Sequence, residues 1–285
     1  MIPASSSRPR AAALPVGQER PGQVFGPLAD DYVAARPGYP PQLFAAMWER
    51  LGSVSGDSRA AGAREPAHAV RILDVGAGTG AATASLLAGG ASVLAVEPAL
   101  PMLDHARAQM GRSAGWIGGV AGRGEALPIK EAWADVVTVA QAFHWLEEAA
   151  ALAEFARALK PGGLLAILWN IAQADDFTRE VWRLVERLNP GHKRPVHVEK
   201  RHTPESLAAH ALFSVELPQE FAHARRLTVD EYVRYALSWS YVGGALAPPE
   251  QRVFERELRG IFERRHGRES REERLLAVAH FARRR

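Results

Sequence analysis

The chain contains no cysteine among its 285 residues. Disulfide bridges, thiolate metal sites and cysteine nucleophiles are therefore excluded. No apolar run approaches the ~20 residues that a membrane-spanning helix needs. Residues 1–24 also lack the continuous apolar segment of a secretory signal. We therefore expect a cytoplasmic protein with no membrane partner.

An excess of charge of one sign is also missing. The formal net charge is only +3, and the arginines of residues 250–274 are mixed with glutamates, as on a solvated helix. The closing run Arg283-Arg284-Arg285 is the type of cluster that can touch nucleic acid, but we expect it to be a solvated chain end. This charge balance predicts no nucleic-acid partner.

Apolar residues are plentiful, at 47% against 24% charged residues, which is an ordinary proportion for a globular protein. The length fits one large domain, or one domain with an elaborated cap. Residues 1–24 are rich in Pro, Ser, Arg and Ala, which predicts a disordered tail. We expect one domain over 25–285, with its core at 70–170 and a cap with the last strands at 171–285.

Strand and helix patterns alternate from residue 70 onward, which is typical of a parallel sheet covered by helices on both faces. The expected strands are 70–75, 92–96, 115–120, 134–140 and 163–169, and the expected helices are 40–51, 79–88, 99–110 and 146–159. After residue 170 we expect helices at 175–188, 229–241 and 249–265, and strands at 213–217, 220–226 and 274–282. The late strands should join the same sheet, while the late helices form a cap over one edge.

A glycine-rich turn joins the first of these strands to its helix, in RILDVGAGTGAAT at 71–83. Gly76, Gly78 and Ala81 satisfy the pattern G-x-G-x-x-G/A, and Glu97 lies at the end of the next strand. Glycines let the backbone approach a ligand closely, and an acid in that position accepts the hydroxyls of a ribose. The pattern predicts a cofactor that contains a nucleoside, either NAD or S-adenosylmethionine (SAM).

Asp74 distinguishes these two cofactors. It lies at the strand end just before Gly76, where a carboxylate near the phosphates of a dinucleotide is costly. SAM has no phosphate and carries an ammonium, a sulfonium and one carboxylate, so an acid at the turn is complementary to it. Its ribose diol is free, so Glu97 suits it as well as it suits NAD. The residues therefore favour SAM.

Further motifs follow the turn in order. They are A-V-E-P (95–98), G-R-G-E-A-L-P (122–128), V-V-T-V-A-Q-A-F-H-W (136–145) and L-K-P-G-G-L-L-A-I-L-W-N (159–170), and F-G-x-x-A-x-x-Y-x-x-x-R-P-x-Y-P (25–40) precedes it. Together with D-V-G-A-G-T-G, they resemble the class I SAM-dependent methyltransferases. The segment 25–40 resembles a small-molecule subgroup that includes trans-aconitate methyltransferase-like proteins. The likeness covers roughly residues 25–170 and implies a Rossmann-like, doubly wound α/β fold with a mostly parallel sheet.

The resemblance also implies which residues contact SAM. Asp74 and the glycine turn would line its methionine portion, Glu97 would bind the ribose, and Pro98 and Met102 would contact the adenine. Family members often carry an acid where this chain has Arg123, so Glu125 or a backbone carbonyl would have to bind the adenine amino group. The full predicted cofactor site is Tyr32, Arg36, Asp74, Gly76, Ala77, Gly78, Glu97, Pro98, Met102, Gly124, Glu125, Ala140, Gln141 and Trp145.

The acceptor is expected beside His144, which follows the fourth strand at the edge where open α/β sheets bind ligands. His144 is either a general base or a residue that shapes the pocket, and both interpretations stay open. A carboxylate acceptor would need no base and would favour a cation, for which Arg36 is the best candidate. Tyr32 and Arg36 could instead bind the carboxylate of SAM, and Trp145 could pack against its adenosine.

Aromatic residues recur late in the chain, with Tyr232, Tyr235 and Trp239 on one face of a predicted helix. The first explanation is a helix core, and the second is an apolar substrate pocket. His192, His197 and His202 lie in one loop without the spacing that places metal ligands on one helix face, so we expect no metal.

The sequence therefore predicts an enzyme that transfers the methyl group of SAM to a small organic molecule and releases S-adenosylhomocysteine. The resemblance favours O-methylation of an organic acid or a secondary metabolite by a monomer or homodimer. The motif [DN]-P-P-[YFW], which the resemblance links to methylation of bases, does not follow the fourth strand. A SAM-binding regulatory protein and a non-methylating enzyme such as a cyclase remain alternatives, whereas an NAD-linked dehydrogenase is disfavoured.

Overall fold

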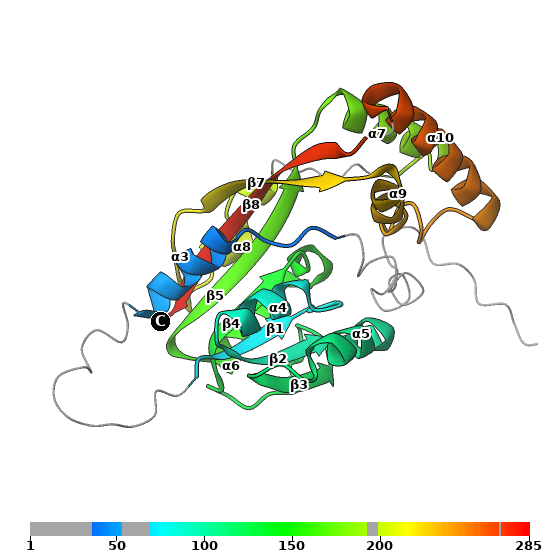
Figure 1. Cartoon of the computed structure of the whole chain (residues 1–285). Helices are drawn as coiled ribbons and strands as arrows, with labels where there is room; N and C mark the ends of the chain where they lie inside the picture. Colours follow the sequence, from blue (N-terminus) through cyan, green and yellow to red (C-terminus); the bar gives the residue numbers. More distant parts are fainter. Residues whose placement is uncertain (1–35, 53–68, 193–198, 268) are drawn as a thin grey trace, which may run out of the picture.

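The computed structural model describes residues 36–52, 69–192, 199–267 and 269–285. Its centre is an eight-stranded sheet in the order β3-β2-β1-β4-β5-β8-β6, in which β7 also pairs with β8 (Figure 1). The parallel strands are β3 (Trp116–Ala121), β2 (Ser92–Glu97), β1 (Arg71–Val75), β4 (Ala134–Ala140) and β5 (Leu159–Ala172). The order 3-2-1-4-5 is doubly wound, so the strand order reverses between β1 and β4.

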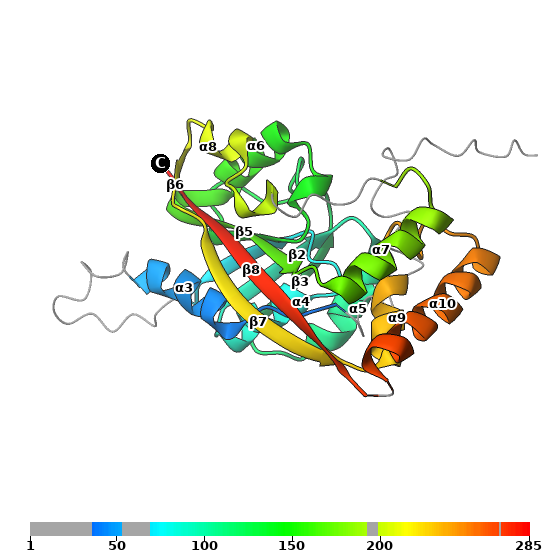
Figure 2. The same ribbon diagram turned by 90° about the horizontal axis from the view of Figure 1, so that it is seen from above.

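The parallel strands are apolar runs because helices cover both faces of the sheet. Figure 2 shows α6 (Glu148–Ala158) and α8 (Glu205–Ala208) on one face, and α3 (Pro41–Gly52), α4 (Ala81–Ala88) and α5 (Leu100–Met110) on the other. Leu152 and Phe155 of α6 pack on the first face, while Met47 of α3 and Leu86 of α4 pack on the second. The predicted two-sided α/β architecture is confirmed.

Three later strands extend the sheet beyond β5. β8 (Arg271–Arg284) runs antiparallel to β5, so the sheet is mixed. The other edge of β8 pairs with β6 (Phe213–Val215) near its C-terminal end and with β7 (Gln219–Leu227) along the rest. The late strands therefore join the same sheet, as predicted.

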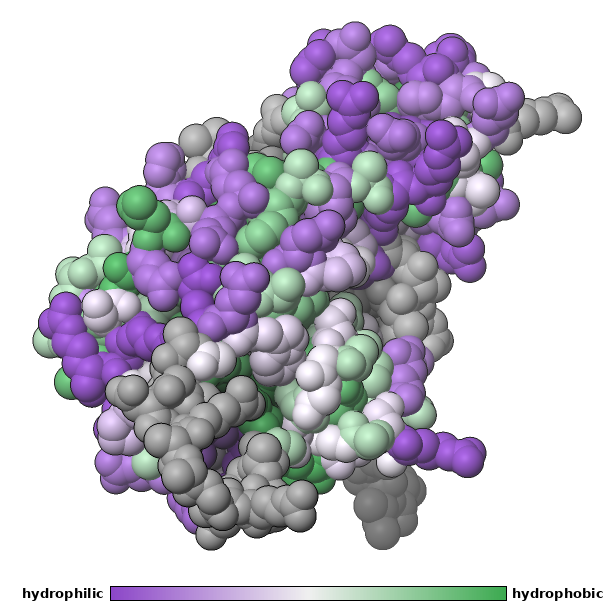
Figure 3. Space-filling view, turned by 60° about the vertical axis from the view of Figure 1, so that its left-hand side comes forward, coloured by the Kyte–Doolittle hydropathy of each residue, from purple (hydrophilic) through white to green (hydrophobic). Residues whose placement is uncertain are grey.

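Three late helices form a cap at the far end of β5 and β8 (Figure 1). They are α7 (Asp176–Leu188), α9 (Val229–Leu237) and α10 (Pro248–His266), and they share an apolar core of their own. Capping boxes begin two of them, with Asp175 and Thr178 at α7 and Thr228 and Glu231 at α9. The outer surface of this cap, at the top of Figure 3, is mostly hydrophilic.

The predicted elements differ from the structure mainly at their ends. β5 begins at Leu159 rather than 163, because Leu159 already pairs with Ala134 of β4. α9 ends at Leu237 rather than 241, where the Ser238 hydroxyl donates to the carbonyl of Tyr235. The short helices α8, η3 (Phe143–Trp145) and η4 (Glu199–Arg201) were not predicted.

The expectation of a solvated chain end is wrong for Arg283 and Arg284, whereas Arg285 is exposed. The guanidinium of Arg283 donates to the carbonyls of Gly162 and Arg50, and that of Arg284 donates to the carbonyl of Leu159. The predicted tail at 1–24 and the domain start at residue 25 lie outside the described residues. None of the described helices is long and apolar enough to cross a membrane.

Candidate functional site

The turn between β1 and α4 requires its glycines. Gly76, Gly78 and Gly80 have φ values of 67°, 58° and 94°, in the left-handed region that glycine adopts without strain. A Cβ atom on Gly76 would lie 2.4 Å from the Cβ of Ala142, in the loop after β4. The turn thus lies directly against the carboxyl end of β4, at the point where the strand order reverses.

The N–H groups of the turn already have acceptors within the protein. Those of Gly76 and Ala77 donate to the carbonyl of Val96 at 2.8 and 3.2 Å, and that of Gly78 donates to Glu97 Oε2 at 2.9 Å. A phosphate-binding turn needs such groups to point at its ligand. These three N–H groups therefore do not form a phosphate cradle.

Asp74 lies beneath the turn and is fully buried. Its two carboxylate oxygens accept hydrogen bonds from the hydroxyls of Thr83 and Thr138, at 2.6 and 2.8 Å. Burial raises the pKa of Asp74 to about 6, although both hydroxyls act in the opposite direction. Asp74 does not line the cavity between the sheet and the cap, and its contact with the methionine portion of SAM stays a prediction.

Glu97 ends β2 and holds the turn from the side. Its carboxylate accepts from the N–H groups of Gly78 and Ala99, at 2.9 and 2.8 Å. Burial raises the pKa of Glu97, the two N–H groups oppose that change, and the nearby charge of Asp74 adds to it. Each oxygen keeps further acceptor capacity, which is the chemistry that a ribose diol needs.

A cavity of about 620 Å³ lies between the sheet and the cap. On the sheet side it begins at Gly76, Ala77 and Gly78, and on the cap side it reaches Trp182 of α7 and Trp239. This volume is in the range of ligand pockets that bury most of a small molecule. Eight of the predicted residues line it: Arg36, Gly76, Ala77, Gly78, Ala140, Gln141, His144 and Trp145.

His144 lies in the wall of this cavity beside two cations. The His144 side chain is exposed to the cavity, although protein atoms occupy most of the space around it. Burial, together with the positive charges of Lys200 and Arg36, lowers the pKa of His144 to about 3. Burial and the charge of Arg36 also lower the pKa of Lys200. The three groups thus converge on one region, where the imidazole is neutral at pH 7.

Gln141 and Asn170 shape the strand ends beside the turn. Gln141 has a φ of 56°, which is strained for a residue other than glycine, and its amide donates to the carbonyl of Asn170 at 2.7 Å. The Asn170 amide donates to the carbonyl of Gly38 at 2.8 Å, and its Oδ1 lies 2.7 Å from Nε2 of His223. These bonds attach the segment that carries Arg36 to the end of β5.

The sequence left open whether the aromatic residues of the cap form a helix core or line a pocket, and the structure shows that they do both. Tyr232, Tyr235 and Trp239 are at least nine-tenths buried and belong to the core of the cap, and all three also line the cavity. The rings of Trp182 and Trp239 are nearly parallel, with centroids 5.8 Å apart. The cap thus presents an aromatic wall to the cavity.

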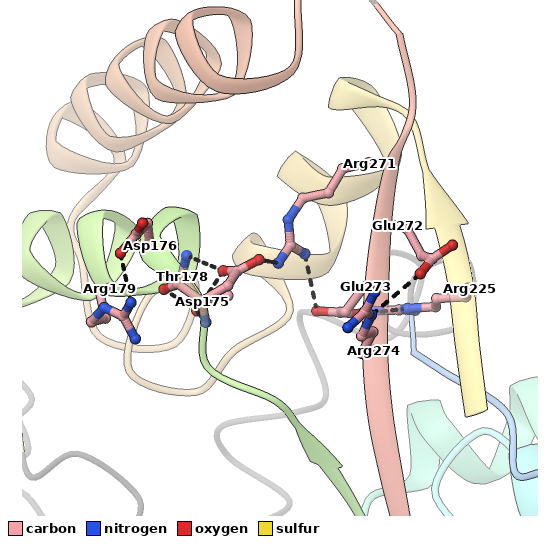
Figure 4. Close-up of polar contacts among 9 residues, drawn as sticks. All are labelled: Asp175, Asp176, Thr178, Arg179, Arg225, Arg271, Glu272, Glu273 and Arg274. Atoms are coloured by element: carbon pink, nitrogen blue, oxygen red, sulfur yellow. Dashed lines mark hydrogen bonds and ion pairs between the residues drawn. The ribbon is translucent and has the colours of Figure 1, made fainter. Parts of the chain in front are cut away.

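A network of charged side chains joins this wall to the sheet (Figure 4). Arg271 of β8 donates to Asp175 at 2.6 Å and lies 3.8 Å from Glu273, while Arg225 of β7 donates to Glu273 at 2.7 Å. Glu273 is buried and lines the cavity, and the Arg271 guanidinium lies 4.6 Å from the centre of the Phe177 ring. The network fixes the cap against β7 and β8.

The other predicted cofactor residues do not line the cavity. Pro98 is exposed and Met102 is buried. Burial alone would raise the pKa of Glu125, but hydrogen bonds from the Glu147 N–H and the Arg123 guanidinium outweigh it and lower the pKa. The set outside the cavity lining is Asp74, Glu97, Pro98, Met102, Gly124 and Glu125. The contacts of these six residues with SAM stay predictions, and Tyr32 lies outside the described residues.

Sequence reasoning did not single out Lys200, Asn170 or Glu273, which all line the cavity. Asn170 carried a detectable signal, because it is the polar residue that interrupts the apolar run of β5. Lys200 and Glu273 reach the cavity only through tertiary packing. Among the described residues, no group of three or more His, Asp or Glu side chains is arranged to hold a metal ion; His197 lies outside those residues.

Comparison with protein families matches residues 73–167 to a methyltransferase domain. An uncharacterized methyltransferase from Mycobacterium tuberculosis is 38% identical over 164 residues, which are 57% of this chain and 59% of that protein. The malonyl-[acyl-carrier protein] O-methyltransferase of Methylococcus capsulatus is 37% identical over 180 residues, 58% of this chain and 62% of that protein. The matches thus span about three fifths of these relatives.

The fold also has a counterpart among solved structures. A protein from Anaeromyxobacter dehalogenans, assigned as a type II methyltransferase, superposes with a TM-score of 0.54 at 23% identity. The likeness covers 88% of this chain and 97% of that one. It confirms the Rossmann-like fold, while the likeness to the trans-aconitate methyltransferase subgroup stays a prediction.

Proposed function

We propose that this chain moves the methyl group of SAM to an oxygen of a small organic acid. The proposal starts from the match of residues 73–167 to a methyltransferase domain. The observation that carries the proposal is the continuity of the cavity from Gly76–Gly78 to the cations Arg36 and Lys200. A donor bound at the turn and an acid bound at the cations would share one enclosed space.

The residues at the turn fit SAM better than a dinucleotide. The N–H groups of Gly76, Ala77 and Gly78 are engaged within the protein, and two carboxylates, Asp74 and Glu97, lie close by. This environment disfavours phosphates and favours a cationic ligand. When bound, SAM supplies a methyl group that its sulfonium has already activated. Gly76, Gly78 and Gln141 would hold its methionine portion, and Glu97 its ribose.

An acid is the acceptor that best suits the other end of the cavity. A carboxylate is a nucleophile at pH 7 and has no proton to lose, so the chain needs no base. The low pKa of His144 makes it a weak base for a neutral hydroxyl or amine acceptor. Arg36 and Lys200 would hold the acid, and the cap would keep water out and fix the geometry. We propose a small molecule as the only partner, with no nucleic acid.

Cofactor binding is the first test. Calorimetric titration should show binding of SAM and S-adenosylhomocysteine and much weaker binding of NAD. Glu97→Ala should weaken SAM binding by roughly 1–3 kcal/mol, because charged hydrogen bonds to the ribose are lost. The exposed Glu131→Ala serves as the matched control and should bind SAM normally. No SAM binding at millimolar concentration would end the proposal.

Turnover is the second test and separates an enzyme from a SAM-binding regulator or a cyclase. Transfer of radiolabelled methyl from SAM should be measured with panels of acids, phenols and amines. We expect a base-labile methyl ester from one of the acids. Labelled phenols or amines without labelled acids would contradict the proposed acceptor while leaving the methyltransferase in place.

A further inference from the structure

One end of the cavity combines an unsatisfied hydrogen-bond donor with nearby positive charge. Trp169 is 4% exposed, lines the cavity, and its indole N–H has no hydrogen-bond partner among the described residues. Leaving a buried donor unsatisfied is costly, so such groups usually mark the place of a ligand or water. The Lys200 ammonium lies 4.5 Å from the centre of the Trp169 ring, and the His144 ring lies 5.4 Å from it.

In the described part of the chain, the acids on the cavity wall contact groups other than Lys200. Glu148 accepts a hydrogen bond from the Ser206 hydroxyl, and Glu273 is held between Arg225 and Arg271, as Figure 4 shows. Among the described residues, no carboxylate forms an ion pair with Lys200. Positive charge therefore remains beside the unsatisfied donor.

The other end of the cavity is lined by aromatic rings. The Trp182 ring is nearly parallel to the rings of Trp239 and His192, at 7° and 6°, with centroids 5.8 and 6.4 Å away. Tyr241 packs against both Trp182 and His192, at 5.2 and 4.0 Å. All four rings line the cavity. A wall of nearly parallel rings favours a planar partner, because stacked aromatic pairs gain energy beyond the area that they bury.

We propose that the acceptor is an aromatic carboxylic acid. Its carboxylate would accept from the Trp169 indole N–H and lie near Lys200 and Arg36, and its ring would pack on the wall of Trp182 and Tyr241. This inference rests on the proposed function, because the carboxylate must lie within reach of the methyl donor. It makes Trp182 a specificity-determining residue.

Three probes of similar size test both ends separately: naphthoate, naphthamide and decahydronaphthoate. Calorimetric titration into the full chain saturated with S-adenosylhomocysteine gives their affinities without turnover. Naphthoate should bind about tenfold more tightly than naphthamide, as expected for hydrogen bonds to a charged group. It should bind roughly three- to tenfold more tightly than decahydronaphthoate, which cannot stack.

Two variants assign these preferences to residues. Lys200→Met should weaken naphthoate binding severalfold more than naphthamide binding, because the amide carries no charge. Trp182→Leu should remove most of the preference for naphthoate over decahydronaphthoate, and Tyr241→Leu tests the same wall if Trp182→Leu unfolds. Lys130→Met and Trp116→Leu are matched controls outside the cavity and should keep both preferences.

Equal affinities for naphthoate and naphthamide would overturn the anion site, and equal affinities for the two acids would overturn the aromatic wall. Failure of all three probes to bind a chain that binds S-adenosylhomocysteine would refute this inference and leave SAM binding intact. A chain that binds neither SAM nor S-adenosylhomocysteine would instead refute the proposed function itself.

Discussion

Two buried carboxylates, Asp74 and Glu97, end neighbouring parallel strands below the glycine turn. Neither is paired with a cation in the part of the chain that the structure describes; hydroxyls satisfy Asp74 and backbone N–H groups satisfy Glu97. Buried charges without a counterion destabilise a fold, so their presence here calls for a role beyond stability. A cationic ligand at this strand edge would supply the missing charge, which agrees with the proposal of SAM.

The pKa of Asp74 gives a first prediction, with Asp74→Asn as the change. Because this pKa is raised from 3.8 to about 6, the native state binds more protons than the unfolded state between these values. Stability from this group is therefore present at low pH and is lost as pH rises through 6. Between about pH 4.5 and pH 7.5, the unsubstituted chain should lose about 2 kcal/mol of its free energy of unfolding. Asp74→Asn has no carboxyl to titrate there and should not show this loss.

Urea unfolding at several pH values measures this difference. Asp104→Asn is the control, because the Asp104 side chain is 66% exposed, and its difference from the native chain should stay nearly constant. A pH-independent difference for Asp74→Asn would show that Asp74 has an ordinary pKa.

His144 gives a second prediction, with His144→Gln as the change. If the acceptor is a carboxylate, no proton is removed, and the low pKa of His144 already disfavours a base. We expect kcat to fall by less than about threefold, well short of the factor of 10² to 10⁴ typical of general base catalysis. Steady-state kinetics across pH decides: a hundredfold fall in kcat, with loss of the acidic limb of the profile, would assign His144 as the base.

At the scale of elements, the junction between β5 and α7 determines how the cap is attached. Asp175 both begins α7 and accepts from Arg271 of β8, as Figure 4 shows. Burial alone would raise the pKa of Asp175, but hydrogen bonds from Thr178 and Arg271 outweigh it and lower the pKa. One side chain thus links the start of a cap helix to β8 of the sheet.

Asp175→Ala should therefore destabilise the chain by about 2 kcal/mol, from the lost helix cap and the lost partner of buried Arg271. Since the pKa of Asp175 is lowered, this stabilisation is present above the ordinary pKa of Asp and is lost as pH falls below it. Urea unfolding at neutral and acid pH measures both effects. Thr228→Ala, which removes the cap of α9 but no ion pair, should cost only about 1 kcal/mol; an equal cost for both would contradict the linking role.

The elements that could be predicted are those whose pattern is set locally. The run Arg71–Val75 and the run Ala134–Ala140 are apolar because both faces are buried, and α7 shows the period of an amphipathic helix. The closing arginines could not be predicted, because their carbonyl partners at Arg50 and Leu159 are remote in sequence. Likewise, no local pattern places Lys200 beside Trp169.

At the scale of the whole molecule, the cavity is formed by the core and the cap. Only the core contributes residues that a sequence motif identifies. The core supplies the turn at 76–78 through a motif, so the cofactor class could be inferred from the sequence. The cap supplies Trp182, Trp239 and Tyr241, which belong to no motif. Their place in the cavity depends on how the cap packs against the sheet. The sequence favoured an organic acid only through the resemblance, and the proposal of an aromatic acid rests on the structure.

Because both ligands would share one cavity, binding of one should depend on the charge of the other. Sinefungin carries an amine in place of the methylated sulfur, so it is cationic like SAM but transfers no methyl group, whereas S-adenosylhomocysteine has a neutral sulfur. A nearby positive charge attracts a carboxylate. Naphthoate should bind about tenfold more tightly with sinefungin than with S-adenosylhomocysteine, equivalent to about 1.4 kcal/mol.

Linkage supplies the internal control, because coupling between two binding sites is reciprocal. Saturation with naphthoate should improve the affinity for sinefungin, relative to that for S-adenosylhomocysteine, by the same factor, while naphthamide should produce no such difference. Calorimetric titrations in both orders measure this. If naphthoate binds equally with either cofactor analogue, its carboxylate does not lie near the reacting sulfur, and the acid is not poised to receive the methyl group.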